Sequence, residues 1–397
     1  MKLRLVLACS SAVASLGLCA TAAPVLAAPA HAVPLNVTVG CSNTAALITA
    51  VQQVNANPDG GTIHLAERCT YPFLDDFANS GNALPVITGK VTIKGEDSTL
   101  IRSASAPFRL IEVAASGQLT LKGLTVAGGN VAVIGGGILN RGTLQVEKST
   151  VAGNQAEQAG GGIANVNGRV TLVRSHVRTN TVTNQNSAEA VGGGISNSAG
   201  GTVELVRTTV SGNTADQAGG GIVNVGTLNV KDSRIEHNAV TNQQGGGGTQ
   251  GGGIYTLGTA VIKDTKIVEN WAGDDGGGIK NATPGTLEIH GGEIGDNKAG
   301  QDGGGLDNSG RATLSKTKVL KNQAGDDGGG INNERAFNGA PAPVLTVKRA
   351  VIKENRAGGE GGGINNVAPG TVQNEHSEIT RNKPTNCAGN VPDCSNH

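Results

Sequence analysis

Aromatic side chains are almost absent from this sequence. Phe, Tyr and Trp together make up 2% of 397 residues, and Trp271 is the single tryptophan. A conventional core built from aromatic rings is therefore excluded. Glycine contributes 63 residues instead. Because glycine-rich, aromatic-poor chains are often disordered or fibrous, periodicity has to decide whether this chain folds.

An excess of charge of either sign is also lacking. Lys and Arg contribute 31 residues and Asp and Glu another 31, so the formal net charge is zero. A neutral chain has no long-range attraction to nucleic acid or to an anionic membrane. After the N-terminal segment, no apolar run approaches membrane-spanning length. We therefore expect neither nucleic-acid binding nor membrane insertion, and we expect a monomer.

The N-terminal segment has the pattern of an export signal. Lys2 and Arg4 precede an apolar run from Leu5 to about Leu18, and small residues stand at Ala30 and Ala32. This order is typical of a secretory signal peptide. We predict a signal peptide over residues 1–32 and a secreted protein of residues 33–397, either free outside the cell or associated with the cell wall.

Four cysteines follow the predicted signal peptide, in two local pairs. An even number of cysteines in an oxidising compartment favours disulfides, and neither pair has the short spacing typical of zinc ligands. We predict the disulfides Cys41–Cys69 and Cys387–Cys394.

The sequence is periodic from about residue 117 onward. GGGI or GGGL occurs nine times, with spacings of 25 to 33 residues. Each period contains three short alternating apolar runs bounded by turn residues, which indicates strands. It also contains two asparagines at fixed positions, as at Asn281 and Asn297, with Thr256 as the exception at the first. Such a period is typical of a solenoid, whose stacked coils would lie roughly 4.8 Å apart. We predict an all-β fold, a right-handed single-stranded parallel β-helix of about 11 coils, in which both asparagine columns form structural ladders.

The period "GGGIxNxGTLxVxxSxVxxNxA" resembles the right-handed β-helix repeats of the pectin-lyase-like superfamily. It is also similar to the polymorphic outer membrane protein repeats, although Val or Ile stands here in place of their Phe. The resemblance implies a parallel β-helix. It leaves function open, because this fold hosts lyases, hydrolases and structural proteins.

The two ends differ from the repeat. Residues 42–57 read as an amphipathic helix that Ser42 or Asn43 could cap. We predict an N-terminal cap with the first coils over 33–115, the β-helix over 116–385, and a disulfide-closed tail over 386–397. The insertion at 333–343, which contains Phe337, is expected to be a bulge without function.

One column of the repeat changes character along the chain. The position before GGG is uncharged in five coils and then acidic in four, at Asp275, Asp302, Asp327 and Glu360. We call these four residues the acidic column; Asp274 and Asp326 precede two of them. Like charges on neighbouring strands repel. The side chains could splay into water, could bind Ca²⁺ through oxygen ligands, or could stay close with separated pKa values.

The third arrangement is the one that a glycosidase needs. Adjacent coils would hold two carboxyl groups near the separation used for sugar cleavage. In this hypothesis Asp275, Asp302 and Asp327 are catalytic, and Trp271 stacks on a sugar. Strand alternation places Tyr255, Lys280 and Asp307 on the outer face, where they would contact substrate.

Two functions from different classes remain. The first is an exported protein that binds a polysaccharide, a cell-surface glycan or extracellular matrix, or that has a structural role at the cell surface, without turnover. The second is a polysaccharide lyase or glycoside hydrolase that uses the acidic column. Neither requires a cofactor, although Ca²⁺ could bind Asp274, Asp275, Asp302, Asp326, Asp327 and Glu360. Copying between repeats would also explain the acids.

Overall fold

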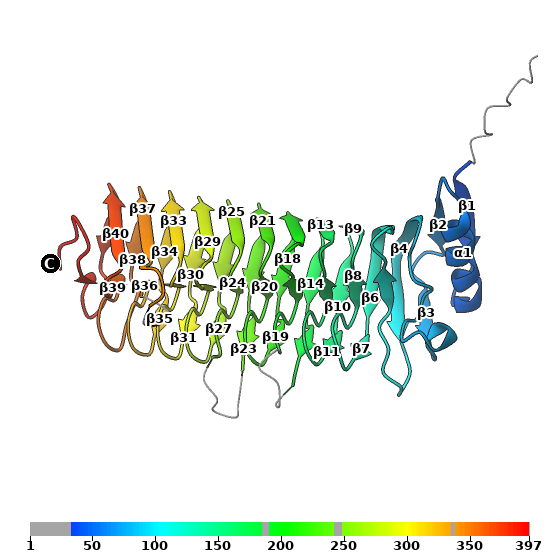
Figure 1. The fold of residues 1–397 in the computed structure, drawn as a ribbon, viewed down its shortest axis with the longest axis horizontal. Coiled ribbons are helices and arrows are strands. Elements are labelled where there is room, and N and C mark those ends of the chain that lie inside the picture. The colour runs from blue at the N-terminus through cyan, green and yellow to red at the C-terminus, as the bar shows by residue number, and fades with distance from the viewer. Residues whose placement is uncertain (1–32, 185–189, 242–247, 335–336, 338, 397) are drawn as a thin grey trace, which may run out of the picture. The chain divides into compact units, whose positions relative to one another are not determined.

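The protein is a parallel β-solenoid of about 13 turns, whose coils stack in chain order (Figure 1). The computed structural model describes residues 33–184, 190–241, 248–334, 337 and 339–396, so the predicted signal peptide lies outside the described residues. The predicted fold class is confirmed. The predicted number of coils, about 11, is too low, because the N-terminal cap contributes strands that continue the stack.

The largest sheet, which we call the long sheet, has 23 strands and supplies two strand positions in most coils. The first position holds β1 (Leu35–Val39), β2 (Gly61–Leu65), β4 (Lys90–Arg102), β6 (Gln118–Ala127), β9 (Thr143–Glu147), β13 (Arg169–Val173), β17 (Thr202–Val206), β21 (Thr227–Lys231), β25 (Thr259–Lys263), β29 (Thr286–His290), β33 (Arg311–Ser315), β37 (Val344–Lys348) and β40 (Thr371–Glu375). The second holds β3 (Thr70–Phe73), β10 (Thr150–Ala152), β14 (His176–Arg178), β18 (Thr209–Ser211), β22 (Arg234–Glu236), β26 (Lys266–Val268), β30 (Glu293–Gly295), β34 (Lys318–Leu320), β38 (Val351–Lys353) and β41 (Glu378–Thr380). β4 and β6 span both positions.

Two further sheets complete each coil. The short sheet has eight strands: β7 (Asn130–Val131), β11 (Gln155–Ala156), β15 (Thr181–Val182), β19 (Thr214–Ala215), β23 (Ala239–Val240), β27 (Trp271–Ala272), β31 (Lys298–Ala299) and β35 (Gln323–Ala324). The third sheet, which we call the GGGI sheet, has eleven strands: β5 (Ile111–Val113), β8 (Ile138–Asn140), β12 (Ile163–Asn165), β16 (Ile195–Asn197), β20 (Ile222–Asn224), β24 (Ile254–Thr256), β28 (Ile279–Asn281), β32 (Leu306–Asn308), β36 (Ile331–Asn333), β39 (Ile364–Asn366) and β42 (Cys387–Gly389). Every pairing is parallel, and equal repeat positions lie opposite each other, as Ile279 does with Leu306.

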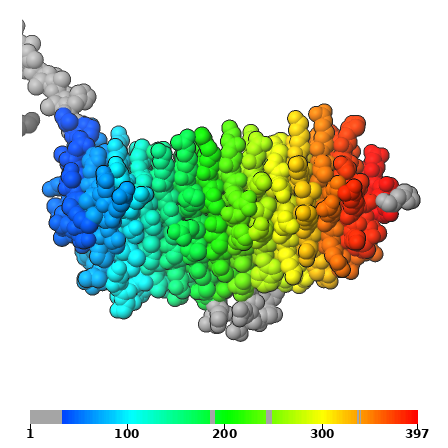
Figure 2. Space-filling model, turned by 180° about the vertical axis from the view of Figure 1, so that it is seen from behind, coloured from blue at the N-terminus to red at the C-terminus, as the bar shows by residue number. Residues whose placement is uncertain are grey.

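Within the repeat, the main core is a stack of aliphatic side chains. In the coil that contains β28, the inward residues are Ile279, Leu287, Ile289 and Ile294, each 2% exposed or less. Alternation within β29 buries Leu287 and Ile289 and leaves the residues between them at the surface. Such a narrow core leaves no room for aromatic rings, which explains their scarcity in the repeat. Figure 2 shows each coil as a narrow band across the surface, in chain order.

The N-terminal cap supplies the larger side chains. Helix α1 (Thr44–Ala56) begins after Asn43, whose side chain accepts a hydrogen bond from the backbone N–H of Ala46, as predicted for one of the two candidate caps. The short 3₁₀ helix η1 (Phe77–Asn79) follows β3. Tyr71 is fully buried and donates its hydroxyl to the carbonyl of Val39. A solenoid end needs such a cover, because it would otherwise expose core and strand edges.

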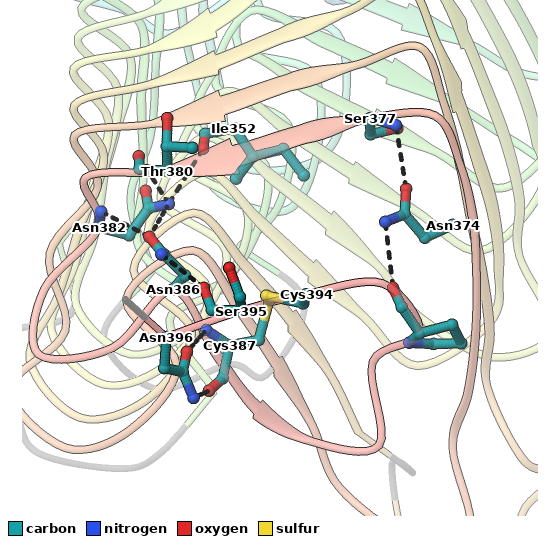
Figure 3. The surroundings of a disulfide bond; sticks show 11 residues. Ile352, Asn374, Ser377, Thr380, Asn382, Asn386, Cys387, Cys394, Ser395 and Asn396 are labelled. Carbon is teal, nitrogen blue, oxygen red and sulfur yellow. Dashed lines mark hydrogen bonds between the residues drawn. A yellow bond between two sulfur atoms is a disulfide. The ribbon is translucent and has the colours of Figure 1, made fainter.

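Both predicted disulfides form, at Cys41–Cys69 and Cys387–Cys394. The second closes the C-terminal tail over the last coil (Figure 3). There Asn386 accepts a hydrogen bond from the side chain of Asn382 and donates to the carbonyl of Ser395. The tail therefore ends the solenoid by replacing the next coil with its own polar groups.

The asparagine column that includes Asn297 is a continuous buried ladder. Each side-chain amide donates to the amide oxygen of the next coil, and that same oxygen also accepts a backbone N–H. Asn270, for example, donates to Asn297 with both its Nδ2 and its backbone N, at 2.9 and 3.0 Å. This pattern runs from Asn154 to Asn382 and ends at Asn386. The predicted structural role is confirmed.

The other asparagine column, next to the GGGI isoleucines, has one gap. Asn224 donates to the hydroxyl of Thr256, but no ladder bond joins Thr256 to Asn281. Two buried oxygens in this column have no hydrogen-bond partner, Oδ1 of Asn140 and Oδ1 of Asn281. Asn140 is the first member of the ladder and Asn281 follows the threonine. Both oxygens therefore lack a partner because no amide precedes them.

Candidate functional site

The acidic column stacks as the repeat predicts. Earlier members of the same position pair from coil to coil, ending with Ala218 opposite Gln250. The side chain of Gln250 then reaches Asp275, with Nε2 2.9 Å from Oδ2. Beyond that point the backbone bonds continue the stack, since the carbonyls of Asp275, Asp302, Asp327 and Glu360 each accept an N–H from the preceding coil.

Hydrogen bonds to the next coil reduce the repulsion within this column. Oδ1 of Asp302 accepts the backbone N–H of Asp327 at 2.8 Å, and Oδ1 of Asp327 accepts that of Glu360 at 2.6 Å. A carboxylate that accepts backbone N–H groups is stabilised in its charged form. This arrangement, in which Asp302 and Asp327 each accept a backbone N–H of the next coil, was not among the three predicted for the column.

The neighbouring aspartates, Asp274 and Asp326, differ from each other. Oδ2 of Asp274 accepts the N–H groups of Gly248 and Thr249, and Oδ1 accepts the side chain of Gln301. Partial burial alone would raise the pKa of Asp274, but these hydrogen bonds outweigh it and lower the pKa. Asp326 is exposed. Asp274 therefore stabilises the turns around it through these hydrogen bonds.

The residue after each GGGI isoleucine forms what we call the floor column, on the outer face of the GGGI sheet. In chain order its members are Leu139, Ala164, Ser196, Val223, Tyr255, Lys280, Asp307, Asn332 and Asn365. We predicted outward-pointing residues here, yet most are buried, with Lys280 7% and Asp307 2% exposed. The glycine turn that precedes each short strand packs closely against this column. A Cβ on Gly303, for instance, would lie 2.5 Å from the Cβ of Asp307.

Lys280 is the centre of a buried polar group. Its Nζ lies 3.3 Å from Oδ2 of Asp275 and contacts Oδ2 of Asp307 directly. Oδ1 of Asp307 accepts a hydrogen bond from Nδ2 of Asn332, and the distance is 3.0 Å. Oδ1 of Asn332 accepts a hydrogen bond from Nδ2 of Asn365 at the same distance. Four neighbouring coils are thus joined by side chains outside the core. This chain is a third ladder beside the two asparagine ladders.

The pKa values in this group depend on burial and on the charges of neighbouring side chains. Burial raises the pKa of Asp302 to about 6, and the charges of Asp307, Asp275 and Asp327 contribute in the same direction. Burial and the charge of Asp307 also raise the pKa of Asp275, despite the opposing effect of Lys280. Burial alone would lower the pKa of Lys280, but the two contacting carboxylates outweigh it and raise the pKa. Burial raises the pKa of Tyr255 as well.

These residues line a cleft of about 450 Å³ over the GGGI sheet. Its walls hold Gln250, Tyr255, Leu257, Asp275, Lys280, Ala282, Thr283, Gln301, Asp302, Asp307, Ser309, Asn332, Glu334 and Phe337. Five predicted site residues are therefore brought together: Tyr255, Asp275, Lys280, Asp302 and Asp307. The sequence analysis missed Phe337, which is 62% exposed and comes from the insertion that we had expected to have no function.

The other predicted residues do not line this cleft. Trp271 belongs to β27 of the short sheet, where it is 38% exposed between Ala239 and Lys298. Asp275 is only four residues further along the chain, but it lies in the bend between β27 and β28, where it lines the cleft. Asp327 and Glu360 lie further along the stack, beyond the cleft walls. The aromatic side chains at the cleft are therefore Tyr255 and Phe337.

Metal binding was a separate prediction for the acidic column and its neighbours. Within the described ranges, no group of three or more His, Cys, Asp and Glu side chains is placed to hold a metal ion. Several of the carboxylate oxygens proposed as ligands already accept backbone or amide hydrogens. Calcium binding at Asp274, Asp275, Asp302, Asp326, Asp327 and Glu360 stays a prediction that melting experiments can test.

Comparison of the chain with protein-family models, with curated proteins and with solved structures gave no match in any of the three. No helix in the described part of the chain is both long and apolar enough to cross a membrane.

Proposed function

We propose that this chain is an exported β-solenoid of the pectin-lyase-like kind that binds a polysaccharide or another extracellular glycan without turnover. The observation that carries the proposal is the cleft over the GGGI sheet. Its walls combine carboxylates, amides and hydroxyls with two aromatic side chains, Tyr255 and Phe337. Converging polar groups beside apolar surface are typical of sites for small hydroxyl-rich ligands, and aromatic rings offer a flat face to a sugar. The signal-like N-terminus and the two disulfides support export.

The charge of the cleft narrows the ligand class. Four carboxyl groups line it, from Asp275, Asp302, Asp307 and Glu334, against one ammonium group from Lys280. An excess of negative charge disfavours a polyuronate chain through like-charge repulsion. Neutral glycans and glycans with free amino groups fit this balance better.

Hydrolysis of the bound glycan is the second candidate function. The observation that favours it is the pKa of Asp302, which burial raises to about 6. A carboxyl group that stays largely protonated up to about pH 6 can act as a general acid in mildly acidic solution. Asp275 would then act as the base or the nucleophile.

A binding and turnover screen tests both functions. Purified protein would be assayed for retention and product release on a neutral glucan, partly deacetylated chitin and polygalacturonate, each with and without calcium. We expect retention on one of the first two, weakened at least tenfold by Asp275→Asn and by Asp302→Asn. The control is Asp232→Asn, because Asp232 is an exposed corner residue with φ +50°, a conformation that asparagine also adopts.

Each outcome decides between the candidates. Retention without new reducing ends supports the binding function. Release of reducing ends that Asp302→Asn abolishes supports the hydrolase instead. Retention on polygalacturonate alone would contradict the charge argument, and retention on no polymer would leave a structural role.

A further inference from the structure

We propose that Lys280 and Asp307 form an intramolecular amide bond, an isopeptide cross-link between neighbouring coils. The two residues lie directly opposite each other, on β28 and β32. Their side chains are 9% and 3% exposed, and Nζ of Lys280 contacts Oδ2 of Asp307. Holding an amine against a carboxyl carbon in a fixed register converts a slow bimolecular condensation into an intramolecular one.

A proton carrier stands beside the reacting pair. Oδ2 of Asp275 lies 3.3 Å from Nζ of Lys280. The amine must lose a proton before it can attack, because its two carboxylate neighbours favour the ammonium form. Burial and the charge of Asp307 raise the pKa of Asp275, so that this carboxylate can accept the proton. General acid–base catalysis requires a group of this kind within hydrogen-bond reach.

A hydrogen-bond donor faces the oxygen on which charge develops. Nδ2 of Asn332 lies 3.0 Å from Oδ1 of Asp307. When the nitrogen adds to Cγ of Asp307, negative charge builds on Oδ1, and a preplaced amide N–H stabilises it. The group therefore contains a nucleophile, an electrophile, a proton carrier and an oxyanion donor, each on a rigid strand or turn.

The step balances without another reactant. The nitrogen lone pair of Lys280 forms the new N–C bond, and the bond from Cγ to Oδ2 of Asp307 breaks. Two of the three ammonium protons pass through Asp275 to Oδ2, which leaves as water, and the third stays as the amide N–H. The cleft above the pair gives the water a way out, since Lys280, Asp275 and Asp307 all line it. Asp275 ends as it began.

Mass spectrometry of the exported protein tests this cross-link directly. After both disulfides are reduced and alkylated, we expect the wild-type chain to be lighter than its sequence mass by one water. A tryptic digest should contain one branched peptide that joins the segments around Lys280 and Asp307, with no cleavage after Lys280. Lys280→Arg should have its full sequence mass, because a guanidinium group is a poor nucleophile.

A second variant separates the cross-link from a plain ion pair. Asp275→Asn keeps a hydrogen-bonding side chain but removes the proton carrier, so we expect at least a tenfold lower fraction of branched peptide. The wild-type measurement needs no variant to fold. A wild-type chain with its full mass and linear peptides on both sides of Lys280 would overturn the proposal, and the contact would then be an ion pair only. This result is independent of glycan binding.

Discussion

The floor column divides the solenoid into two regions that share one backbone and differ in chemistry. In the N-terminal region the column contains Leu139, Ala164 and Val223, each 5% exposed or less. In the C-terminal region the same position holds Lys280, Asp307 and Asn332, each 7% exposed or less. The strands, the register and the covering turns are equivalent in both regions. The scaffold therefore tolerates either kind of floor.

The difference shows what a polar floor requires. Apolar residues at this position need only a covering turn, because burial itself stabilises them. Buried charges instead require partners, since an unpaired buried charge costs several kcal/mol. Lys280 accordingly contacts two carboxylates, and Asp307 is also bonded to Asn332. The cleft lies over this polar region.

Among the single substitutions, removal of Lys280 should lower the stability of the polar region most. Lys280→Ala leaves Asp275 and Asp307 close together and partly unpaired, so we expect a loss of roughly 3–5 kcal/mol in the free energy of unfolding. Guanidinium-induced unfolding followed by circular dichroism measures this loss. Ala164→Ser, at the same position in the apolar region, is the matched control and should change stability by less than about 2 kcal/mol.

Converting the polar floor into an apolar one should recover that loss. The double variant Lys280→Met with Asp307→Leu imitates the N-terminal region, and replacing a buried ion pair by apolar residues is often close to neutral. We expect its unfolding midpoint to lie well above that of Lys280→Ala while glycan retention falls. A double variant as unstable as Lys280→Ala would show that the two regions are not equivalent scaffolds.

The asparagine ladder should matter equally in both regions. Asn180 and Asn297 each accept two hydrogen bonds at Oδ1 and donate two at Nδ2. Alanine at either position leaves buried polar groups without partners, and we expect a loss of roughly 3 kcal/mol each. Unequal losses in denaturant unfolding would contradict a shared scaffold.

Filling the gap in the other ladder should stabilise the boundary between the regions. In Thr256→Asn the new Oδ1 can accept from Asn224, and the new Nδ2 can donate to the partnerless Oδ1 of Asn281. A net hydrogen bond contributes about 1 kcal/mol, and a raised melting temperature would reveal it. Thr265→Asn, which changes a buried threonine of another column, is the control and should lower the melting temperature instead.

The stability of the polar region should also depend on pH. The pKa of Asp302 is raised from 3.8 to about 6 in the folded chain, so the folded state binds more protons than the unfolded state between these values. Its contribution to stability therefore falls as the pH rises from about 4 to about 6. We expect Asp302→Asn to melt progressively higher than the wild type over this interval, with no such trend for Asp232→Asn. A constant difference would contradict the raised pKa.

Much of the fold could be predicted from the sequence, because a solenoid repeats its contacts. The period of GGGI determined which residues stack, and it correctly predicted the asparagine ladders and the order of the acidic column. The two local cysteine pairs separately predicted both disulfides. It also named five of the residues that line the cleft. The number of coils was underestimated because the strands of the cap, such as β1 and β2, do not carry the repeat motif.

The tertiary structure alone decided which polar residues meet. Trp271 and Asp275 are close in sequence, yet Trp271 lies in the short sheet and Asp275 lies in the following bend at the cleft. Phe337 reaches the same cleft from an insertion. Burial of the floor column also required the three-dimensional turns, since alternation along a strand predicts only which face a residue occupies. The columns follow from the order of residues along the chain, because stacking is periodic along the axis. The residues that meet at the site depend on how each coil bends around that axis. The spacing of the repeat does not predict this bending.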